Sequence, residues 1–145
     1  MENMDDRSYI KLLTVSAVKT ATVTSDVCDT EGYQGASFHV IYGDSGDTLS
    51  STLYWTAKLQ SCATEGGTYA DVGTDGILIA SSNSFGLINA PTEDQGIYHI
   101  GYDGTDRYVK VVVTATGTHT NGTIITIIAE LGMPRMMSED GKVNP

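Results

Sequence analysis

The stretch Leu53-Tyr54-Trp55-Thr56-Ala57-Lys58-Leu59-Gln60-Ser61-Cys62 decides the fold class of this chain. Leu53, Trp55, Ala57 and Leu59 stand at every second position, and the residues between them are mostly polar. A period of two places these four side chains on one face of a β-strand, whereas a helix needs a period of 3.6. The stretch therefore predicts a strand with one face in a core and the other toward water.

Similar segments lie on both sides of this strand and are separated by glycines and Asp/Gly pairs, which favour turns. Segment 8–18 fits either a strand or one or two helical turns. No internal repeat marks a solenoid or propeller. The chain therefore predicts an all-β, single-domain antiparallel β-sandwich or barrel-like fold over residues 1–145, of jelly-roll or immunoglobulin-like type. The further predicted strands are 20–27, 34–42, 76–81, 84–88, 97–102, 107–116 and 123–131.

Two local patterns refine this picture. Asp94-Gln95-Gly96-Ile97-Tyr98-His99-Ile100 resembles the D-x-G-x-Y-x-C stretch of immunoglobulin domains, with Ile100 at the cysteine position. The resemblance implies a corner hydrogen bond from Tyr98 and a buried position for Trp55. The Asn121-Gly122 pair predicts a β-hairpin, because both residue types tolerate positive φ.

Composition excludes several function classes. Eight basic residues against 18 acidic ones give a formal charge of −10, and the cations are scattered. A nucleic-acid surface needs a Lys/Arg face, so we expect no direct nucleic-acid binding. No stretch reaches the roughly 20 apolar residues of a membrane span. The acidic start, MENMDDRSYIKLL, does not fit a secretory signal, so we expect synthesis in a cytoplasm.

The sequence contains no catalytic or metal-binding pattern. Cys28 and Cys62 match no zinc or redox spacing; a disulfide between them is geometrically possible, but a cytoplasmic origin favours two reduced thiols. The histidines His39, His99 and His119 show no ligand spacing. The carboxylate pairs fit turns better than calcium loops. We therefore expect no enzyme activity, no metal and no cofactor. These pairs are Asp44/Asp47, Asp71/Asp75 and Asp103/Asp106.

A resemblance to a known class of proteins rests on three longer phrases. They are residues 53–60 followed by Gly66-Gly67-Thr68-Tyr69-Ala70-Asp71-Val72, then residues 98–111, and then Thr114-Ala115-Thr116-Gly117-Thr118 with the Ile-rich strand and Leu131-Gly132-Met133-Pro134-Arg135. Together these phrases resemble small structural proteins of tailed-bacteriophage virions, of the capsid decoration type.

That resemblance implies a non-enzymatic capsid decoration, or cement, protein that binds the major capsid protein of the same phage outside the head. It also implies a homo-oligomer, with a trimer favoured, located on the capsid surface of the virion. The alternatives are a tail-tube or head-closure component, or an immunoglobulin-like glycan-binding or adhesion module.

Both ends of the chain are candidates for extended contact segments, an N-terminal arm over about 1–11 and a C-terminal tail over about 133–145. Arg135, Met136 and Met137 combine a cation with flexible apolar side chains that fill irregular grooves. The Ile-rich strand is expected to be covered on both faces or to line a subunit contact. The candidate subunit or capsid contacts are Leu12, Leu13, Ile125, Ile127, Arg135, Met136 and Met137.

Overall fold

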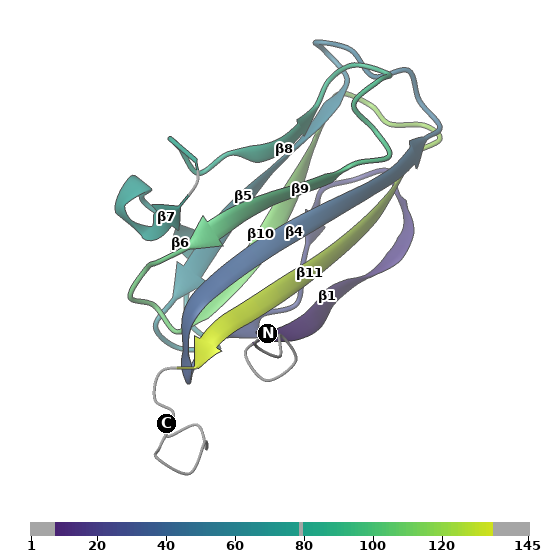
Figure 1. The fold of residues 1–145 in the computed structure, drawn as a ribbon. Coiled ribbons are helices and arrows are strands. Elements are labelled where there is room, and N and C mark those ends of the chain that lie inside the picture. The colour runs from purple at the N-terminus through teal and green to yellow at the C-terminus, as the bar shows by residue number, and fades with distance from the viewer. Residues whose placement is uncertain (1–7, 79, 135–145) are drawn as a thin grey trace.

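A computed structural model describes residues 8–78 and 80–134 and shows two antiparallel sheets packed face to face (Figure 1). The predicted β-sandwich is confirmed, and the open segment 8–18 is a strand. The described part contains no α-helix; a short 3₁₀ turn, η2, covers Thr74–Gly76. The strands are β1 (Ser8–Lys19), β2 (Val23–Thr24), β3 (Cys28–Asp29), β4 (Tyr33–Ser45), β5 (Tyr54–Cys62), β6 (Ala70–Asp71), β7 (Ile77–Leu78), β8 (Phe85–Ile88), β9 (Ile97–Tyr102), β10 (Tyr108–Thr116) and β11 (Thr123–Pro134).

The strands divide into sheet A, in the order β1-β11-β4-β9-β7, and sheet B, in the order β2-β10-β5-β6. In sheet B, β3 also pairs with β10 and β8 also pairs with β5. Figure 1 shows β4 and β11 as long neighbours in one layer, with β5 and β10 in the layer behind. Among the described residues, no helix has the length and hydropathy needed to cross a membrane.

The core lies between the sheets and follows the predicted alternation. Trp55, Ala57 and Leu59 are buried, while their neighbours on β5 are only partly covered. Phe38 and Val40 face them from sheet A. Burial of such side chains is the main stabilising term, about 1.5–3 kcal/mol for each.

One buried hydrogen-bond chain joins the two sheets. The indole Nε1 of Trp55, in sheet B, donates to Thr123 Oγ1 in sheet A at 3.0 Å. The Thr123 hydroxyl donates to Ser45 Oγ at 3.0 Å, and Ser45 Oγ donates to the Asp47 carbonyl at 3.0 Å. Trp55 is fully buried, so its N–H needs a partner inside the protein.

The loop between β10 and β11 corrects the hairpin prediction. β10 belongs to sheet B and β11 to sheet A, so the loop is a crossover between sheets. Gly122 has a φ of +79°, but Asn121 does not adopt positive φ. The loop is held by Asp47, whose carboxylate accepts the backbone N–H of Asn121 at 3.0 Å and of Gly122 at 2.8 Å. These tertiary bonds replace the local pairing of a hairpin.

The corner implied by the immunoglobulin resemblance is present. Tyr98 Oη donates to the Glu93 carbonyl at 2.7 Å, so the tyrosine pins the loop before β9. Ile100, at the position of the immunoglobulin cysteine, is fully buried. The sandwich thus keeps the corner without the disulfide.

The two cysteines lie on opposite faces of sheet B. Cys28 is buried and aligns through Val109 with the buried Ser61. Cys62 is one residue further along β5, so its side chain points to the other face. Both are free thiols. Opposite faces of one sheet do not provide the geometry of a disulfide.

The proposed end segments fall only partly within the described residues. Of the N-terminal arm, Ser8–Lys11 forms part of β1 and pairs with Ala129–Gly132 of β11. Of the C-terminal tail, Met133 and Pro134 complete β11, and residues 135–145 lie outside the described residues.

We expect Asp47→Ala to lower the free energy of unfolding by about 2–3 kcal/mol, because several loop amides lose their acceptor. The hydrogen bonds donated by these backbone amides also hold the pKa of the Asp47 carboxyl below its ordinary 3.8. The ionised carboxylate therefore stabilises the fold fully above pH 3.8, and this contribution is lost as the pH falls through the lowered pKa. Urea unfolding at several pH values measures both effects. Asp44→Ala, at an exposed neighbour, is the control; an equal loss there would contradict the role of Asp47.

We expect the two thiols to react at different rates in the native protein. Burial raises the pKa of the Cys28 thiol to about 11. Near pH 8 its thiolate population, and hence its rate with a thiol reagent, is roughly 100-fold below that of a free cysteine. Peptide mapping after timed alkylation should show Cys62 labelled first and Cys28 only after denaturation. Equal labelling of both would show that Cys28 is not in the core.

Candidate interaction surface

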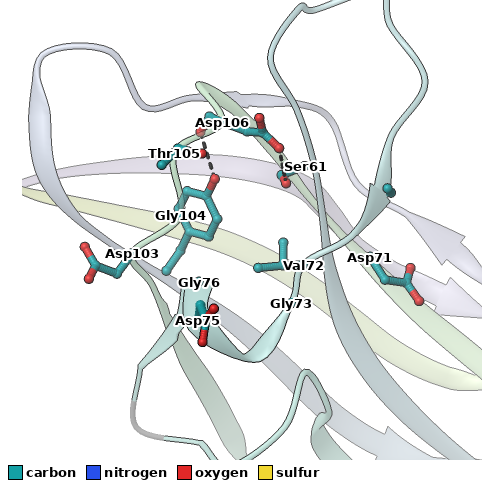
Figure 2. Close-up of a pocket in the computed structure, with 12 residues that line it drawn as sticks. Ser61, Asp71, Val72, Gly73, Asp75, Gly76, Asp103, Gly104, Thr105 and Asp106 are labelled. Carbon is teal, nitrogen blue, oxygen red and sulfur yellow. Dashed lines mark hydrogen bonds between the residues drawn. The ribbon is translucent and has the colours of Figure 1, made fainter.

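Four of the carboxylates weighed for metal binding lie around one cleft. Asp71, Asp75, Asp103 and Asp106 line an open cleft of about 300 Å³ between loops (Figure 2). Figure 2 shows the carboxylates of Asp71 and Asp103 on opposite sides of the cleft, pointing away from each other. Within residues 8–78 and 80–134, no group of three or more His, Cys, Asp or Glu side chains is placed to hold a metal ion.

Two of these carboxylates have structural partners. Asp106 Oδ2 accepts the hydroxyl of Ser61 at 2.7 Å, and Asp71 accepts Lys58 Nζ and the amide of Gln60, both at 2.9 Å. The Gln60 and Lys58 hydrogen bonds hold the pKa of Asp71 below its usual range. Asp71 and Asp106 therefore hold the strands and loops around the cleft through hydrogen bonds to other side chains.

The outer face of sheet B is mainly polar, as expected for a sandwich surface in water, although Leu87 on β8 is 47% exposed. Lys58 pairs with Asp71, and Lys110 Nζ lies 4.3 Å from the centroid of the Tyr69 ring. The outward side chains on β5 and β10 are Tyr54, Thr56, Lys58, Gln60, Cys62, Tyr108, Lys110, Val112, Thr114 and Thr116.

The outer face of sheet A is different, because large aliphatic side chains gather on it. Ile97 is 64% exposed, Ile10 is 61% exposed and Leu12 is 52% exposed. A monomer in water rarely leaves so many adjacent aliphatic side chains uncovered, and such patches mark protein contacts. We call this surface the apolar face. Its aliphatic members are Ile10, Leu12, Val18, Ile41, Leu78, Ile97, Ile124 and Ile128.

Cross-strand registry makes the apolar face continuous. Leu12 on β1 lies opposite Ile128 on β11, which lies opposite His39 on β4. In another row, Thr126 lies opposite Ile41, and Ile41 lies opposite Ile97 on β9. Side chains directly opposite each other in a sheet are about 5 Å apart and in contact.

Small residues give the apolar face its relief. Gly101 makes room for Leu78, since a Cβ there would come within 2.8 Å of the Leu78 Cβ. Next to it, Gly35 and Gly132 lie directly opposite each other on β4 and β11. With Ser37 and Glu130 these residues line a shallow hollow of about 240 Å³. The face therefore combines raised aliphatic side chains with one depression.

The edges of sheet A are less available than its face. β1 has two register shifts, between Leu12 and Thr14 and between Thr14 and Ala17, and such bulges discourage strand addition. The Leu13 carbonyl already accepts the Asp26 N–H at 3.0 Å. The other edge strand, β7, has two residues. Face packing is therefore better supported than the addition of a strand.

A polar cluster lies within the apolar face. His39 and His99 are directly opposite each other, with ring centroids 5.6 Å apart, and His39 Nε2 lies 3.4 Å from Glu130 Oε2. Burial lowers the pKa of His39, His99 acts in the same direction, and Glu130 opposes both. The His39 ring is thus held neutral near neutral pH.

The structure separates the candidate contact residues into three groups. Leu12 is exposed on the apolar face. Leu13, Ile125 and Ile127 are at most 2% exposed and pack in the chain's own core, which leaves them no surface to offer a partner. The alternation of β11 places the neighbours of the two isoleucines outward instead. The remaining candidates, Arg135, Met136 and Met137, lie outside the described residues.

Sequence reasoning missed most of the apolar face. Ile124 and Ile128 belong to the Ile-rich strand. They alternate with Ile125 and Ile127, so the sequence indicated that the two pairs point to opposite faces of the strand. The contribution of Ile97 and Ile41 had no signal in the sequence, because it depends on β4 and β9 being neighbours in sheet A.

We expect the free energy of unfolding to fall as the pH drops from about 7.5 to 5.5. The pKa of His39 is about 6.5 in the unfolded chain and lower in the folded protein. As the pH falls, the unfolded chain therefore binds the proton first, and protonation favours unfolding. His39→Gln should reduce this dependence, whereas His99→Gln should retain the part due to burial. Urea unfolding of all three proteins at several pH values checks this. An unchanged pH dependence in His39→Gln would contradict the assignment.

Comparisons with known proteins identify no family. No protein-family model matches the chain, and no curated protein matches it. One solved structure to which it is similar is the crystal structure of the infectious bursal disease virus VP2 subviral particle, with 12% sequence identity and a TM-score of 0.25. The similarity covers 95% of this chain and 45% of that chain, so this chain spans less than half of its length. A TM-score this low is a weak likeness, and no conclusion about fold or function rests on it.

Proposed function

We propose that this chain is a non-enzymatic structural protein of a phage virion, most specifically a capsid decoration protein. It binds the major capsid protein on the outside of the head and stabilises the shell. It acts as a homo-oligomer, without a cofactor and without direct contact to nucleic acid. The sequence resemblance to structural proteins of tailed phages is the basis for proposing a phage virion.

The observation that carries the proposal is the contrast between the two outer faces of the sandwich. The outer face of sheet B is mainly polar, with lysines, glutamine and threonines beside Leu87 and Val112, whereas sheet A presents the larger set of aliphatic side chains on the apolar face. An enzyme concentrates its distinctive residues in a concave site with convergent polar groups. Here the distinctive residues are aliphatic and lie on a broad sheet, which favours binding to other protein subunits.

The charge distribution supports the same proposal. The chain carries 18 acidic residues, yet the described parts of β1, β11, β4 and β9 contain two of them, Glu130 and the exposed Asp44 at the end of β4. Acidic residues elsewhere keep the protein soluble before assembly. The apolar face is then available for contact.

The glycan-binding alternative has one observation in its favour. Tyr54, Tyr69 and Tyr108 are partly exposed on or beside the outer face of sheet B. However, Lys110 stacks on Tyr69 and the Arg107 guanidinium lies 5.0 Å from the Tyr108 ring centroid, so cations already cover two of these rings. This face therefore fits sugar stacking less well.

Co-sedimentation with capsids of the same phage tests the proposal. The purified protein should pellet with assembled heads at a fixed number of copies per capsid, and it should raise the temperature at which heads release DNA. Binding to tail tubes or head-closure rings instead would favour the alternative virion role. Absence of binding to any virion part would overturn the proposal.

A further inference from the structure

We infer that the apolar face is the contact surface for a second copy of this chain, which packs sheet A against sheet A about a twofold axis. This inference goes beyond the proposed function, because the pair forms in solution without a capsid. It also specifies a dimer instead of the trimer that the resemblance favours, since a broad sheet face is covered most completely by one other sheet face.

The size of the face reaches the lower bound for a specific dimer. The four long strands of sheet A, spaced about 4.8 Å apart, span roughly 19 Å. From Ile124 to Gly132 the face extends roughly 27 Å along the strands, at about 3.4 Å per residue. The flat product is about 500 Å² for each copy and about 1,000 Å² for the pair, and side-chain relief adds to it. This total reaches the roughly 1,000 Å² that a specific interface requires.

Charge selects the face on which two copies approach. Each chain has a formal charge of −10, so two copies repel each other over most of their surface. The apolar face is the broad area where the described residues place almost no charge, with Glu130 next to His39 as its polar element. A basic partner would gain more from the acidic loops than from this face. A second acidic copy gains most from the aliphatic contact.

The relief of the face suits self-packing. Ile10 and Ile97 are the most exposed of its aliphatic side chains, and Ile10 lies opposite Glu130, which lines the hollow. In a twofold contact the same patch meets itself, so a raised side chain of one copy can enter the hollow of the other. Neither edge of sheet A offers an equal surface, because β1 carries bulges and β7 is short.

Sedimentation equilibrium over a concentration series, without capsids, tests the inference. The wild-type protein should reach a mass twice the 15.4 kDa of the chain. Ile97→Glu and Ile10→Glu each place a charge in the contact and should weaken the dimer by at least about 100-fold. Val112→Glu makes the matched change at a half-buried valine on the outer face of sheet B, and it should leave the dimer unchanged. Circular dichroism confirms that each variant is folded.

A variant that fills the hollow distinguishes a shape-complementary contact from non-specific hydrophobic association. Ser37→Leu adds apolar area but occupies the hollow, so it should weaken the dimer about tenfold. Stronger association of Ser37→Leu would overturn the packing of a raised side chain into the hollow.

Four outcomes overturn the inference as a whole. They are a wild-type monomer at all concentrations up to about 100 µM, a trimer, an Ile97→Glu variant that still dimerises fully, or equal weakening by Val112→Glu. Capsid binding is measured separately with the same variants. A dimer that ignores capsids would leave this inference intact and overturn the proposed function, and a monomer that decorates capsids would do the reverse.

Discussion

The indole N–H of Trp55 must find a partner inside the protein, and much of the structure follows from how it does so. Trp55 is fully buried in sheet B, and Thr123 at the start of β11 in sheet A supplies the acceptor. That bond fixes where β11 begins, and through Ser45 it reaches Asp47. Asp47 in turn holds the crossover loop, while the His119 ring packs 4.4 Å from that of Trp55. One buried donor thus relates both sheets and the loop that joins them.

This arrangement explains why β10 and β11 are not a hairpin. A local turn at Gly122 would place the two strands in one sheet, but the tertiary bonds to Asp47 direct the chain across to sheet A. β11 then lies between β1 and β4, with its inner side chains in the core. Its outer side chains join those of β4 and β9. The apolar face is therefore a consequence of the crossover and not of any single strand.

The unequal outer faces connect the fold to the proposed role. Sheet B keeps its surface polar through cross-strand pairs such as Lys58 with Asp71. In sheet A, the edge strand β1 carries bulges and the edge strand β7 is short, whereas the outer face is aliphatic. Natural sheets usually protect exposed edges against uncontrolled pairing. Edges that discourage strand pairing, next to an exposed aliphatic face, favour association by stacking of sheets over association by strand addition.

The sequence by itself determined the fold class, the inward alternation of β5 and β10, and the corner made by Tyr98, because each depends on residues close together in the chain. Local periodicity reports which side of a strand is buried. It does not report which strands are neighbours. The tertiary structure alone decided that Ile41 meets Ile97, that Cys28 and Cys62 face opposite ways, and that Ile125 and Ile127 belong to the core. The physical reason is that a binding face on a sheet is assembled across strands, by registry between segments distant in sequence.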